Sequence, residues 1–112
     1  MSLRVALSIL FFAAVLEAAG DALVRSGLHA HALATRVLLL ASGAVVLFGY
    51  GCVVNSPPWD FGRLLGIYVV FFFVVAQFIS WIFFHQRPSG AVLLGGAFIV
   101  AGGAIISAAS LR

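Results

Sequence analysis

Four long apolar stretches constrain the fold of this chain more than any other feature. They predict helices over residues 3–24, 37–54, 62–84 and 90–111, and apart from Arg63 the last three carry no charged side chain. A helix of about 20 apolar residues crosses the 30 Å hydrocarbon layer of a bilayer. Only helices satisfy their backbone within such a unit, and no ten-residue alternation suggests a barrel. We therefore predict an all-α fold, one four-helix transmembrane domain over residues 1–112.

Composition supports this class and excludes others. The chain is 64% hydrophobic and 8% charged, whereas soluble domains are roughly 45–50% apolar and about 25% charged. The net charge of +3 is dispersed over the chain, so nucleic acid is not an expected partner. The single cysteine, Cys52, permits no intrachain disulfide and belongs to no zinc or redox motif. His29 and His31 lack an accompanying cysteine or acid, so we predict interfacial histidines, no metal site and no cofactor.

The first apolar stretch has an alternative interpretation. Arg4, the apolar run 5–16 and the small residues 18–20 together resemble a signal peptide with its cleavage site. Because three further spans follow, we expect the first stretch to be a retained membrane helix.

Two acids interrupt the first predicted helix. Glu17 and Asp21 are four residues apart, which places them on one helical face. A charge at membrane depth costs at least about 2.5–3.5 kcal/mol and therefore indicates function by default. In a helix over residues 3–24, Glu17 lies roughly 5 Å and Asp21 roughly 11 Å from the midpoint. Glu17 is the deeper candidate, while Asp21 either pairs with Arg25 or lines the mouth of a site.

Small residues predict where helices pack closely. Ala14, Ala18 and Ala22 recur every four residues beside the acidic face, so this face should meet another helix rather than lipid. In the last stretch, the pairs Gly95-Gly96 and Gly102-Gly103 are seven residues apart and predict a flat strip for tight helix contact.

Polar and aromatic residues mark further candidate positions. Tyr50 either places its hydroxyl in a cavity or lies at the membrane interface. Tyr68 and Phe72 share one face of the third helix, and Gln77 on the same helix requires a polar partner in hydrocarbon. No nucleophile–histidine pair, phosphate-binding loop or second deep acid–base group accompanies them, so an enzyme is not expected.

Arginine distribution gives no topological preference. With four spans the two termini and the middle loop share one side of the membrane, and each side carries three arginines: Arg4, Arg63 and Arg112 against Arg25, Arg36 and Arg87. Such a chain can insert in both orientations, and two oppositely inserted copies can pair as an antiparallel homodimer.

These features together resemble the small multidrug resistance family of the drug/metabolite transporter superfamily. Residues 80–87 (Ser-Trp-Ile-Phe-Phe-His-Gln-Arg) are similar to the family's Ser-Trp-Gly-Phe-Phe-Gly-Gln-Arg, and residues 16–20 to its Ala-Glu-Val-Ile-Gly. The resemblance implies that Glu17 binds protons and a cationic substrate in turn. It also implies that Gly95 and Gly102 form a dimer contact, and that the protein works in a bacterial-type inner membrane.

The third helix departs from the family pattern. Tyr68 stands where the family has a tryptophan, Leu65 where it has a tyrosine, and residues 70–72 (Val-Phe-Phe) where it has a Gly-Val-Gly hinge. We expect a proton/substrate site of Glu17, Asp21, Tyr68, Leu65 and Tyr50. The resemblance has no precedent for Asp21, and Tyr50 matches the family's second-helix tyrosine only if it serves from a different turn.

The expected function is proton-coupled export of a cationic or amphipathic small molecule by alternating access. Two alternatives remain. Leu65, Tyr68 and the phenylalanine run of residues 71–73 make the predicted site more apolar than the family's. Such a site suits a lipid-linked or amphipathic substrate, as in small flippase subunits of the same superfamily. In a non-transport protein, Glu17 would instead pair with Gln77 or Arg25 to fix the assembly.

Overall fold

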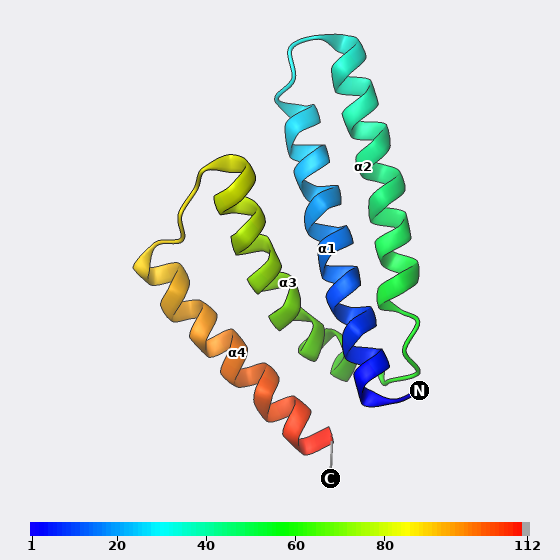
Figure 1. The fold of residues 1–112 in the computed structure, drawn as a ribbon, viewed down its shortest axis with the longest axis vertical. Helices are drawn as coiled ribbons and strands as arrows, with labels where there is room; N and C mark the ends of the chain where they lie inside the picture. Colours follow the sequence, from blue (N-terminus) through cyan, green and yellow to red (C-terminus); the bar gives the residue numbers. More distant parts are fainter. Residues whose placement is uncertain (111–112) are drawn as a thin grey trace.

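The computed structural model describes residues 1–110 and consists of four α-helices arranged as two antiparallel hairpins (Figure 1). This confirms the predicted all-α fold, in which all four helices are long and apolar enough to cross a membrane. α1 contacts both α2 and α3, and α3 contacts α4. The helices are α1 (Leu3–Leu28), α2 (Leu33–Val54), α3 (Phe61–Phe84) and α4 (Gly90–Ser110).

The first two helices differ from their sequence-based bounds at one connection. α1 continues to Leu28, four residues beyond the predicted end, and α2 begins at Leu33, four residues before its predicted start. The difference has a simple cause, because the hydrophobic pattern stops at Arg25 and Arg36 although both residues remain helical. Apolar length measures the part of a helix that lies in hydrocarbon, and the helical backbone continues into the interface.

Helix ends follow local chemistry elsewhere. The Ser2 hydroxyl caps α1 by accepting a hydrogen bond from the Val5 backbone N–H at 3.2 Å. The Pro57-Pro58 pair separates α2 from α3, because proline cannot continue a helical hydrogen-bond ladder. His85 ends α3 in the left-handed region, with φ 56°, and the backbone N–H of the next residue, Gln86, donates to the Ser80 carbonyl at 3.1 Å.

Glycines allow α1 and α2 to lie almost backbone to backbone. A Cβ added to Gly43 would lie 2.7 Å from Val24 Cγ2 and 3.1 Å from both the Gly20 carbonyl oxygen and the Val24 nitrogen. A Cβ on Gly20 would lie 2.7 Å from the Leu47 side chain, and one on Gly27 would lie 2.9 Å from Leu40. Such close approach is typical of packing between membrane helices.

Two of the three alanines of the predicted stripe are buried within the single chain, and Ala22 is half-buried. Ala14 is fully buried and Ala18 is 4% exposed, and both belong to a buried cluster shared with Leu10, Leu64 and other apolar residues of α1, α2 and α3. These two alanines therefore pack the helices of one chain. The cluster also holds Tyr68, so it positions the candidate site.

The two glycine pairs of α4 divide between two faces instead of forming one strip. Gly96 lies against Phe73 of α3, and Gly103 lies against Val70, so both glycines are part of the α3–α4 contact. A Cβ on Gly95 or Gly102 would meet nothing within 4 Å among the described residues. Adjacent helical residues point about 100° apart, which is why each pair separates in this way.

Candidate functional site

The structure joins the deep glutamate to a tyrosine of another helix. The Tyr68 hydroxyl of α3 donates a hydrogen bond to Glu17 Oε2 of α1 at 3.0 Å. Tyr68 is 4% exposed and Glu17 is half-buried. α1 has 26 residues, and Glu17 lies about 2 Å along the helix axis from the middle of the helix.

Aromatic rings adjoin this carboxylate. The Tyr50 ring of α2 lies 5.7 Å from the Tyr68 ring, and the Phe72 ring, one turn along α3, stacks on Tyr68 at 6.3 Å. Aromatic faces attract cations, and a carboxylate beside them adds a full negative charge. Glu17, Tyr50, Tyr68 and Phe72, which we call the carboxylate–aromatic cluster, therefore have the chemistry of a cation-binding site.

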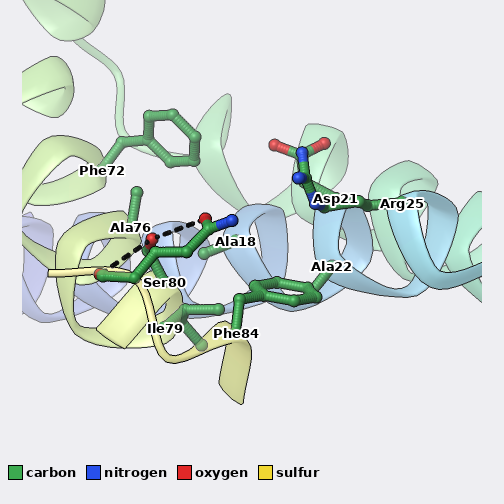
Figure 2. Close-up of a pocket in the computed structure, with 10 residues that line it drawn as sticks. Ala18, Asp21, Ala22, Arg25, Phe72, Ala76, Ile79, Ser80 and Phe84 are labelled. Atoms are coloured by element: carbon green, nitrogen blue, oxygen red, sulfur yellow. Dashed lines mark hydrogen bonds between the residues drawn. The ribbon is translucent and has the colours of Figure 1, made fainter. Parts of the chain in front are cut away.

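A cavity of about 180 Å³ lies between α1 and α3 next to this cluster (Figure 2). Phe72 belongs to both, and Asp21 lines the cavity one turn along α1 from Glu17. Figure 2 also shows the Ser80 hydroxyl near the cavity wall, where it donates to Gln86 Oε1 at 3.3 Å. The lining residues are Ala18, Asp21, Ala22, Arg25, Phe72, Ala76, Ile79, Ser80, Phe84 and Gln86.

Arg25 makes a different contact from the one that spacing suggested. Its guanidinium lies 5.5 Å from the centre of the Phe84 ring, across the cavity from α1 to α3. Asp21 and Arg25 form no ion pair within 4.0 Å. Asp21 is exposed. The i,i+4 interpretation is therefore wrong for this structure, and Asp21 is a lining group of the cavity.

The remaining predicted residues make no hydrogen bond to the carboxylate in the described part of the chain. Leu65 is half-buried and packs against the buried cluster, so its contribution is an apolar wall. Gln77 is half-buried, and the hydrogen bond to Glu17 comes from Tyr68 instead. Sequence reasoning missed Gly20, Gly27 and Gly43, although Ala6, Ala13, Gly20 and Gly27 repeat every seven residues along α1 and are all buried. That repeat could have identified the α2-facing side.

The fold and its apolar exterior define a class: the protein is a multi-pass integral membrane protein with four membrane-spanning helices. The chain is similar to a UPF0060 membrane protein of Herpetosiphon aurantiacus, with 35% identity over 66 residues. The matched part is 57% of this chain and 60% of that relative, so the similarity spans less than two thirds of the relative's length. No family model and no solved structure matches the chain.

Proposed function

We propose that the protein is a proton-coupled exporter of a cationic or amphipathic small molecule, with Glu17 as the coupling residue. The observation that carries the proposal is the Tyr68–Glu17 hydrogen bond, which holds a carboxylate against aromatic rings close to the middle of a membrane helix. An ionisable side chain at this depth costs free energy, so its presence in a membrane helix indicates a function.

The coupling follows from competition for one carboxylate. A proton neutralises Glu17 and removes the attraction for a cation, whereas a bound cation favours the ionised form. The Tyr68 hydroxyl orients the carboxylate, and the faces of Tyr50 and Phe72 supply cation–π attraction. Alternating exposure of Glu17 to the two sides of the membrane would then exchange protons for substrate.

The working unit in this proposal is an antiparallel homodimer. Three arginines on each side of the membrane favour neither insertion direction. Gly95 and Gly102 leave a small-residue face on α4 that a second copy could approach closely. Two copies of Glu17 would then share one chamber, with protons and an organic cation as the expected ligands.

The test is transport by the full chain reconstituted in liposomes with an imposed pH gradient. A panel of organic cations is offered to the wild type, to Glu17→Gln and to Asp60→Asn. Asp60→Asn removes the same charge outside the apolar span, from a residue that makes no side-chain capping bond. We expect Glu17→Gln to abolish proton-driven transport and Asp60→Asn to retain it. Proton-driven transport by Glu17→Gln would refute the mechanism.

One observation favours lipid-like cargo as a second candidate. A larger cavity of about 610 Å³ adjoins the first, and Ser26 is its single polar lining residue among those described. Such a surface suits an amphipathic or lipid-linked substrate. Flipping of fluorescent lipids in liposomes, with Glu17→Gln as the comparison, separates the two functions, because lipid flipping would not require the carboxylate. The lining residues are Val15, Ala19, Ala22, Leu23, Ser26, Ile79, Phe83 and Phe84.

A further inference from the structure

A second polar feature lies at the end of the molecule where α1 and α3 begin and α4 ends (Figure 1). A cavity of about 350 Å³ there brings together Arg63 from the first turn of α3, Trp59 from the preceding loop and Ser107 from α4. It is separate from the carboxylate–aromatic cluster, with which it shares no lining residue among those described. We call it the Arg63 cavity.

The Arg63 guanidinium contacts an aromatic ring, but one of its nitrogen atoms has no hydrogen-bond partner. It lies 5.1 Å from the centre of the Trp59 ring, and its Nε is buried without a hydrogen-bond partner. A buried donor left unpaired costs free energy comparable to a lost hydrogen bond. A guanidinium that stacks on a ring directs its N–H groups outward in its own plane, which matches the oxygens of a phosphate group.

The start of α3, which carries Arg63, has backbone N–H groups that no intrahelical hydrogen bond uses. The first internal hydrogen bond of α3 runs from the Leu64 N–H to the Asp60 carbonyl at 2.8 Å. The N–H groups of Phe61, Gly62 and Arg63 therefore precede the helical ladder, and the Asp60 side chain makes no capping bond to them. The start of α3 carries the positive end of the helix dipole. Asp60 is exposed and forms no ion pair with Arg63.

The other side of the cavity is apolar. Leu3 and Leu7 of α1 and Ile67 of α3 line it, and Leu7 and Ile67 each lie one helical turn further into their helices than Leu3 and Arg63. Polar donors at the membrane surface and an apolar wall below them match a phospholipid, whose phosphate adjoins its acyl chains. A tryptophan beside the site is typical of the headgroup level.

We propose that the Arg63 cavity binds one phospholipid of net negative headgroup charge, with its phosphate on the Arg63 guanidinium and an acyl chain along Leu7 and Ile67. The ligand chemistry is a phosphodiester monoanion joined through glycerol to acyl chains, as in phosphatidylglycerol. This site is independent of the exporter proposal, and neither depends on the other.

The experiment counts lipids retained by the purified full-length protein in native mass spectrometry. Phosphatidylglycerol is titrated against phosphatidylcholine for the wild type, Arg63→Gln, Arg63→Lys and Arg36→Gln. Arg36→Gln is the matched control, because it removes the same charge from an exposed position at the other end of the molecule. Arg63→Lys keeps the charge without the planar fork of donors. Circular dichroism checks that each variant retains its helix content.

We expect the wild type to prefer phosphatidylglycerol and Arg63→Gln to weaken its binding about tenfold, with an intermediate loss in Arg63→Lys and less than a twofold change in Arg36→Gln. If Arg63→Gln does not fold, the loss in Arg63→Lys relative to Arg36→Gln carries the test. Equal phosphatidylglycerol binding by the Arg63 and Arg36 variants would overturn the proposal that the Arg63 cavity is the lipid site. A separate titration with inorganic phosphate distinguishes the source of the anion, and displacement of phosphatidylglycerol by millimolar phosphate would overturn the lipid assignment.

Discussion

Gly43→Ala tests whether the close contact between α1 and α2 is a structural requirement. The added Cβ would meet Val24 Cγ2 at 2.7 Å and backbone atoms of Gly20 and Val24 at 3.1 Å. Backbone atoms cannot rotate away, so the helices must separate, and overpacking of this kind costs about 1–3 kcal/mol. Alanine recovers up to about 1 kcal/mol through helix propensity. We therefore expect a net loss of about 1 kcal/mol in the free energy of unfolding.

Two variants serve as internal comparisons. Gly49→Ala lies in the same helix, where the new Cβ meets nothing within 4 Å among the described residues, so we expect no loss and a gain of up to about 1 kcal/mol. Gly20→Ala meets mainly the flexible end of Leu47 and should fall between them. The assay is reversible unfolding in mixed micelles followed by circular dichroism. Equal stability of Gly43→Ala and Gly49→Ala would refute the packing argument.

The other predictions concern the candidate site, the two faces of α4 and the contact between Arg25 and Phe84. Tyr68→Phe should lower cation affinity at least tenfold, because it removes the hydroxyl that orients Glu17, and equilibrium binding of a fluorescent cation measures this. Gly103→Leu should disrupt the α3–α4 contact and lower thermal stability, whereas Gly102→Leu should leave the monomer stable and weaken the proposed dimer in cross-linking experiments. Arg25→Gln should cost about 0.5–1 kcal/mol in unfolding experiments through loss of the cation–π contact. Stability unchanged by Arg25→Gln would contradict the last prediction.

The features that sequence could predict are those that depend on one helix at a time. Apolar length predicts the four helices, and a charge inside an apolar run identifies Glu17. The Tyr68–Glu17 bond joins residues 51 positions apart, and its existence depends on the rotation and depth of α3 relative to α1. Contacts between helices set this rotation and depth, and the residue pattern of a single helix does not encode such contacts.

The same limitation explains why sequence spacing could not decide between the two alternatives for Asp21 and Arg25. Spacing of four residues permits an ion pair with Asp21, but the structure offers the guanidinium an aromatic face on α3. An exposed ion pair contributes little, with typical values of 0–1 kcal/mol, so a ring contact of about 0.5–1 kcal/mol can replace it. Local spacing therefore predicts which contacts are possible, and tertiary packing decides which one forms.

The position of the Tyr68–Glu17 bond links stability to the proposed function. Glycines allow α1 and α2 to meet through contacts that include backbone atoms. The α1–α2 hairpin should therefore move as a unit. α4 packs on α3 through Gly96 and Gly103. The Tyr68 hydroxyl donates across the boundary between the two hairpins. Under the proposed function, a proton or cation that changes the partner of Glu17 would therefore act on the contact between the two hairpins.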